Sequence, residues 1–216
     1  LWMPKSERLI ATTEGSNSVA IVEPDGKITS IATGQQGSHR VALLGEERAF
    51  VANIGSGTVS VLDLKANTKL RDLTTGGKPE GIAVASGKVF VGDLTAPRLS
   101  VFDAATYEKL GELTIDGNAI RVIASPDGKT VATSNVNKGT VTLIDAETHG
   151  VLRSFPVSGD PAAAQVTLIW SSDGKRLYAA ETMRNQIAEI DAGTGKVLRR
   201  IDVGKNGDGL AVTRVP

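Results

Sequence analysis

One stretch, residues 49–88, shows the repeating unit of this chain in full: AFVANIGSGTVSVLDLKANTKLRDLTTGGKPEGIAVASGK. Its central run, TVSVLD at residues 58–63, has four counterparts: SVAIVE at 18–23, RLSVFD at 98–103, TVTLID at 140–145 and QIAEID at 186–191. The acids that close these runs are spaced by 63 − 23 = 40, 103 − 63 = 40, 145 − 103 = 42 and 191 − 145 = 46 residues. A period near 40 with several short strands per unit and few helix signals is typical of β-propeller blades.

Each unit contains four predicted strands. In one of them GIAVA (81–85), VFVGD (89–93), RLSVFD (98–103) and KLGELTI (109–115) are separated by short turns. The residues of the first strand are small or β-branched, as expected where strands crowd around a central axis. The fourth strand carries charged residues, as expected of an exposed sheet edge. The pattern predicts an all-β fold, a β-propeller of four-stranded antiparallel blades, with five repeats at approximately 8–47, 48–87, 88–128, 129–174 and 175–216 in a single domain.

The unit at residues 49–88 resembles the repeat of the YVTN-type bacterial β-propellers, and the resemblance covers essentially the whole chain. It implies a rigid platform rather than a particular reaction, because such propellers have diverse functions. Members of that family are often exported and usually have seven blades. The resemblance therefore implies a periplasmic or secreted protein, and the absence of cysteine is equally compatible with the cytoplasm.

The sequence is compatible with two arrangements of the blades. LWMPKSERLI at 1–10 aligns with IWSSDGKRLY at 169–178, so the chain begins inside a first strand, and GLAVT at 209–213 is expected to supply a further first strand. Either this last strand completes the first blade and closes a five-bladed ring, or the five repeats are part of a seven-bladed propeller. The opening residues favour the second interpretation, with two blades upstream.

The amino-acid composition limits the classes of partner that the protein is expected to bind. Twenty-four basic residues balance 24 acidic ones, and aromatic residues make up 4% of the chain, so neither nucleic acid nor an anionic membrane surface is favoured. No apolar run is long enough to cross a bilayer, and membrane insertion is not expected. The expected partner is an unidentified small molecule or protein.

Standard catalytic motifs are missing from the sequence. There is no cysteine, no G-x-S-x-G, no H-E-x-x-H and no glycine fingerprint for a dinucleotide. His149 lies in the turn AETHG and is expected to be solvated, and Trp170 is expected to fill space between blades. No catalytic residue, metal ligand or cofactor is predicted, and enzymatic activity is left open.

The candidate site comes from aligning the first strands. His39, Glu80, Ile120, Val166 and Asp208 occupy one equivalent position, just before the axial strand, and Arg40, Gly81, Arg121, Thr167 and Gly209 occupy the next. In a propeller these positions surround the mouth of the central channel, where ligands are usually held. The predicted ligand-binding residues of this funnel are His39, Arg40, Glu80, Arg121 and Asp208.

Two functions fit these residues. The first is a non-enzymatic binding or scaffold propeller whose funnel holds a small anionic or zwitterionic ligand. The alternative is a metal-assisted lyase or lactone hydrolase with its ion at the channel mouth. The charges can also simply pair with one another across a wet channel.

Overall fold

The computed structural model describes residues 1–212, which form five four-stranded antiparallel sheets with three short 3-10 helices. The elements, in chain order, are β1 (Trp2–Met3), β2 (Arg8–Thr13), η1 (Glu14–Ser16), β3 (Ser18–Val22), β4 (Ile28–Ala32), β5 (Ser38–Leu44), β6 (Arg48–Asn53), β7 (Thr58–Asp63), β8 (Thr68–Thr74), β9 (Pro79–Ala85), β10 (Lys88–Asp93), β11 (Arg98–Asp103), β12 (Lys109–Thr114), β13 (Ala119–Ala124), β14 (Thr130–Asn135), β15 (Thr140–Asp145), β16 (Val151–Pro156), η2 (Pro161–Ala163), β17 (Gln165–Trp170), β18 (Arg176–Glu181), η3 (Thr182–Arg184), β19 (Gln186–Asp191) and β20 (Val197–Asp202).

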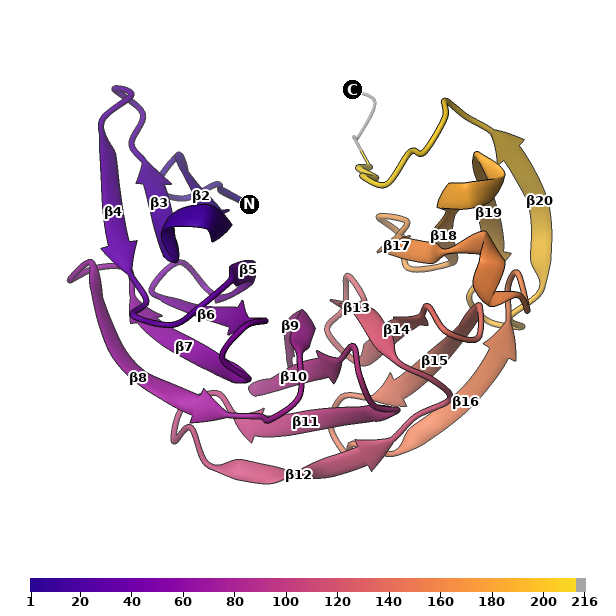
Figure 1. Ribbon diagram of the computed structural model, residues 1–216, viewed down its shortest axis with the longest axis horizontal. Helices are drawn as coiled ribbons and strands as arrows, with labels where there is room; N and C mark the ends of the chain where they lie inside the picture. Colours follow the sequence, from indigo (N-terminus) through magenta and orange to yellow (C-terminus); the bar gives the residue numbers. More distant parts are fainter. Residues whose placement is uncertain (213–216) are drawn as a thin grey trace.

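The sheets, numbered one to five along the chain, stand side by side in an open arc (Figure 1). The strands β5, β9, β13 and β17 lie on the inside of the arc, and β4, β8, β12, β16 and β20 lie on the outside (Figure 1). The all-β propeller with five blades is therefore confirmed. The sheets recur with the predicted period. Each predicted repeat range starts at the second strand of a sheet, so the first strand of that sheet lies just before the range.

The closed five-bladed ring is not the arrangement of the described residues. The first sheet opens with β1, whose Trp2 faces Leu9 as Trp170 faces Leu177 in the fifth sheet, so the predicted alignment of the chain start is confirmed. The expected strand at 209–213 was wrong for residues 209–212, which form no strand, and Thr213 lies outside the described residues. A strand requires a hydrogen-bonded neighbour, and β2 takes its hydrogen bonds from β1 and β3 instead.

Four apolar clusters hold the arc together, one at each junction between neighbouring sheets. Two junctions contain an edge-to-face aromatic pair with ring centroids 6.2 Å apart, formed by Phe50 with Tyr107 and by Phe90 with His149. The expectation of a solvated His149 was therefore wrong. The left-handed backbone of its turn, with φ at 60°, directs the ring onto the core, and its Nε2 is buried without a partner among the described residues.

A row of polar residues at the ends of the second strands is buried as well. Asn53, Asn135 and Glu181 have no exposed surface, and the side chain of Asn135 bonds Thr140 and Thr142 of the adjacent strand. Asn53 and Asn135 tie the second strand to the third, and Glu181 is held by Arg200 of the fourth strand, because a buried amide or carboxylate needs hydrogen-bond partners.

Candidate functional site

Four of the five predicted funnel residues, His39, Arg40, Glu80 and Arg121, lie where the first strand of a sheet begins, and each of their strands carries a bulge there. The register with the second strand shifts between Ser38 and Arg40 in β5, and between Ala119 and Arg121 in β13, so that His39 and Ile120 are the extra residues. The same irregularity appears at the start of β9 and β17. Bulges redirect side chains and are frequent next to functional sites. Here they turn the aligned positions toward the concave side of the arc.

Gly81 allows the strands that carry these residues to approach closely. A Cβ atom at this position would lie 2.6 Å from the backbone nitrogen of Val122, so a larger residue would push β9 away from β13. The close approach brings Glu80 on β9 to Arg121 on β13, with 3.7 Å between Glu80 Oε1 and Arg121 Nη1. Only 10% of the Glu80 side chain and 9% of the Arg121 side chain are exposed.

His39 joins this pair from the other side. Its Nε2 lies 3.5 Å from Glu80 Oε1, and its Nδ1 lies 2.9 Å from Glu14 Oε2. Glu80 Oε1 is thus shared between the imidazole and the guanidinium. Glu14 is the residue that the prediction of the site missed, because it belongs to η1 of the preceding sheet and only the sheet-to-sheet packing brings it to His39.

Asp208 reaches the same cluster from the irregular segment after β20. Its Oδ1 lies 3.7 Å from Arg121 Nη2 and accepts a hydrogen bond of 2.8 Å from the Thr167 hydroxyl. Thr167 also accepts a hydrogen bond of 3.3 Å from Arg121 Nη2. Glu14, His39, Glu80, Arg121, Thr167 and Asp208 therefore form one continuous polar chain across the inside of the arc.

Arg40 contributes a second guanidinium. It lines a cavity of about 420 Å³ together with His39, Arg121 and residues of β2. Burial, and then the positive charge of Arg121, lower the pKa of Arg40 to about 10. Arg40 takes part in no ion pair formed by residues 1–212, so its charge has no direct counter-charge in this part of the chain.

Arg121 is the least satisfied group of the cluster. Its Nε and Nη1 are buried and have no hydrogen-bond partner within residues 1–212. Burial lowers its pKa, and the nearby charges of Asp208 and Glu80 oppose that effect. A buried guanidinium normally donates most of its five N–H groups, so these two nitrogens leave Arg121, which lines the cavity, with unmet hydrogen-bonding capacity.

The protonation of His39 gives a direct check of this geometry. The hydrogen bond with buried Glu80 is the main cause that raises the His39 pKa, burial opposes it, and Glu14 raises it further. Although Glu14 is the nearer carboxylate, its side chain is 55% exposed and water screens its charge. Asp208, which the sequence argument also placed in the funnel, is not among the groups that shift the His39 pKa.

We expect NMR titration of His39 to give a pKa above the ordinary value of about 6.5. Glu80→Gln should lower that pKa more than Glu14→Gln does, and Glu47→Gln, an exposed control, should leave it unchanged. Because the folded-state pKa is raised, the stabilisation from protonated His39 is complete below the unfolded value and is lost as the pH rises through the folded value. A His39 pKa below 6.5 in the unmodified protein would contradict this arrangement.

Two negative findings apply to the described residues. None of their helices is long and apolar enough to cross a membrane. Within 1–212 there is also no group of three or more His, Cys, Asp or Glu side chains placed to hold a metal ion.

Comparison with solved structures supports the fold. One similar chain belongs to hydrazine synthase of Kuenenia stuttgartiensis, with a TM-score of 0.68 and 16% identity over 95% of this chain and 86% of that chain. A second, streptogramin B lyase, has a TM-score of 0.78 and 16% identity, over 91% of this chain and 65% of that chain. At this level of identity the likeness concerns the fold alone.

No curated protein matches the sequence. The YVTN label suggested by the repeat stays a prediction. The model of the family described as YNCE-like beta-propeller matches residues 85–214, which is more than half of the chain, and the protein therefore belongs to the YNCE-like β-propeller family.

Proposed function

We propose that this protein is a non-enzymatic binding propeller that holds a small zwitterionic molecule, with a carboxylate and an ammonium group, at the mouth of its channel. The observation that carries the proposal is the Arg121 guanidinium, which is 9% exposed and has two buried nitrogens without a hydrogen-bond partner in residues 1–212. Leaving a buried donor unpaired costs free energy, and a ligand carboxylate would supply the missing acceptor.

The charges around the cavity favour a zwitterion over a simple anion. Arg40 and Arg121 attract a carboxylate, and their mutual repulsion, which lowers the pKa of Arg40, is relieved when an anion lies between them. Glu80 and Asp208 flank Arg121 and would repel a second negative charge. The Asp208 side chain is 57% exposed, so one of its oxygens can accept a hydrogen bond from an ammonium group.

The size of the site fits a small molecule. The cavity of about 420 Å³ lies within the usual range for small-ligand pockets, roughly 300–1,000 Å³. Its wall toward the first sheet includes Leu9, which is 42% exposed and offers an apolar surface to the body of a ligand.

Titration calorimetry with three matched probes tests the proposal: glycine, acetate and methylamine, of which the first combines the charged groups of the other two. We expect glycine to bind more tightly than either. Arg121→Gln and Arg40→Gln should each weaken glycine binding about 10- to 100-fold, since one charge-assisted hydrogen bond contributes about 1.5–3 kcal/mol.

The matched control is Arg199→Gln. Arg199 is 68% exposed on the outer strand β20 and pairs with Glu189, so its loss should leave glycine binding unchanged. Equal binding of acetate and glycine would replace the zwitterion by an anion. Absence of binding by all three probes, or equal effects of Arg199→Gln and Arg121→Gln, would refute the site.

No contact among the described residues favours the alternative function, a metal-assisted lyase or lactone hydrolase. It is examined in the same series by adding Mg²⁺, Mn²⁺ or Zn²⁺ without a ligand. A stoichiometric metal-binding isotherm that His39→Ala and Glu80→Gln abolish would support that alternative.

A further inference from the structure

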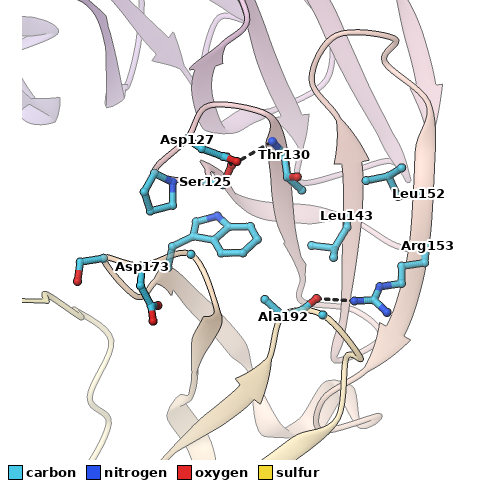
Figure 2. A pocket seen from close by; sticks show the side chains of 13 residues that line it. Ser125, Asp127, Thr130, Leu143, Leu152, Arg153, Asp173 and Ala192 are labelled. Carbon is cyan, nitrogen blue, oxygen red and sulfur yellow. Dashed lines mark hydrogen bonds between the residues drawn. The ribbon is translucent and has the colours of Figure 1, made fainter.

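A second cavity, of about 670 Å³, lies between the fourth and fifth sheets. Its lining includes the β13–β14 turn, the β17–β18 turn and residues of β15 and β16, as Figure 2 shows. Arg121 and Thr167 stand near the beginning of β13 and β17, whereas Ser125 and Trp170 stand at the far ends of the same strands. This inter-sheet cleft therefore opens on the side of the arc away from the channel-mouth site.

The cleft lies at one of the two junctions without an aromatic pair. Phe50 and Phe90 pair with Val61 and Val101 in register, and the equivalent partner of Leu143 in the fourth sheet is Ala132. The turn position held by Tyr107 and His149 in the third and fourth sheets is Gly195 in the fifth, again with positive φ. Phe155 takes part of the vacated space, since a Cβ atom at Gly195 would lie 2.7 Å from its ring.

Beyond Phe155 the space stays open and has apolar walls. They are formed by Leu143 of β15, Leu152 of β16 and Trp170 of β17. Leu152 is 57% exposed although it borders the cavity, and the Trp170 Nε1 is buried without a hydrogen-bond partner in the described chain. An aromatic ring fills the corresponding space at two of the other junctions.

Two aspartates lie at the rim of the cleft, and each has one carboxylate oxygen without a hydrogen bond within residues 1–212. Asp127 Oδ1 accepts hydrogen bonds from Ser125 and from the Lys129 backbone, and Asp173 Oδ1 does the same in the second turn. These bonds lower the pKa of both carboxyl groups, so both are ionised near neutral pH. Neither Oδ2 atom takes part in a hydrogen bond within residues 1–212.

The positive charges near the rim are directed elsewhere. Arg153 donates a hydrogen bond to the Ala192 carbonyl, drawn in Figure 2, and its guanidinium lies 5.4 Å above the Phe155 ring. Lys129 and Lys175, which follow the two aspartates, are exposed and do not line the cleft. The cleft therefore combines apolar walls with two free carboxylate oxygens.

We propose that the inter-sheet cleft is a second binding site, which takes an arylalkylamine with its ring between Leu143 and Trp170 and its ammonium group on Asp127 or Asp173. The ring occupies the place of the aromatic pair found at two of the other junctions. The carboxylates select a cation, because a charge-assisted hydrogen bond is stronger than a neutral one. This site is independent of the channel mouth and of the function proposed for it.

The test uses phenethylamine as the probe and ¹H–¹⁵N NMR of the whole chain as the readout. Only two tryptophans are present, and Trp2→Phe assigns the indole signal of Trp170. We expect a saturable shift of the Trp170 signal and none of Trp2, which is 58% exposed at the other end of the arc. Two matched probes, uncharged 2-phenylethanol and anionic 3-phenylpropanoate, should bind about tenfold more weakly or not at all.

Substitutions then separate the charges from the fold. The double change Asp127→Asn with Asp173→Asn should weaken phenethylamine binding about tenfold. Asp25→Asn, in a similar Asp-Gly turn of the first sheet, should have no effect. Because the asparagines also alter two turns, Leu152→Lys is the second variant. Its exposed position tolerates the change, and its ammonium group should abolish binding without lowering the melting temperature.

Three results would overturn the second site: no saturable shift at Trp170, binding of 3-phenylpropanoate as tight as that of phenethylamine, or unchanged affinity in Leu152→Lys. None of them bears on the glycine titration, so the two proposals can fail separately.

Discussion

Replacement of Arg200 by methionine should lower the free energy of unfolding by about 3 kcal/mol, the expected cost of leaving a buried charge without its partner. Glu181 has no exposed side-chain surface, and Arg200 holds both of its oxygens at 2.8 and 3.1 Å. The same guanidinium donates to the Val157 carbonyl and so links the fourth sheet to the fifth. We place the cost at the low end of the known range because Arg200 is 34% exposed and Arg184 remains 3.8 Å from Glu181.

Urea unfolding measures this effect, and the double variant Arg200→Met with Glu181→Gln shows its cause. If the cost arises from the uncompensated carboxylate, neutralising Glu181 should restore part of the lost stability. Arg199→Met is the matched control: its side chain is 68% exposed, and the change should stay within about 0.5 kcal/mol. An Arg200→Met variant as stable as the parent would show that Glu181 is not an isolated buried charge in solution.

Replacement of Phe90 by alanine should lower the free energy of unfolding by about 3–5 kcal/mol. Phe90 is completely buried between the third and fourth sheets and meets the edge of His149. The substitution would leave a cavity, because the neighbouring sheets are held by their own backbone hydrogen bonds and can collapse only partly. The position equivalent to Phe90 in the fourth sheet is occupied by Ala132. The Phe90→Ala variant would therefore have alanine at this position in both sheets.

Urea unfolding of Phe90→Leu and Trp2→Ala completes this series. Leucine should recover more than half of the loss, whereas Trp2→Ala should be close to neutral because that side chain is 58% exposed. A loss below about 1 kcal/mol for Phe90→Ala would mean that the junction repacks freely, and the physical reason given for the inter-sheet cleft would then fail as well.

The alternation of apolar and polar residues, with acids 40 to 46 positions apart, was sufficient to predict four-stranded sheets and their order in the chain. It also aligned His39, Glu80 and Ile120 with one another, and the bulges fall at these positions of β5, β9 and β13. Hydrogen-bonded hairpins are local, so their pattern is contained in short segments. The repeat then fixes which residues stand at equivalent places.

The contacts between neighbouring sheets could be known only from the tertiary structure. Glu14 rather than Asp208 is the second carboxylate at His39, because η1 of one sheet packs beside β5 of the next. Residues 209–212 form no strand, although their composition fits one, because no neighbouring strand is there to pair with them. Strand formation and ion pairing both depend on what lies within a few ångströms.

The sequence by itself determined the sheets, their number and which residues stand at equivalent places in them. Only the tertiary structure decided that Arg121 lacks partners within residues 1–212 for two buried nitrogens and that a cleft stays open beside Trp170. The physical reason is the range of the interactions. Backbone pairing within a hairpin involves residues close in sequence, whereas the packing of one sheet on the next depends on the volume and charge of side chains from separate repeats.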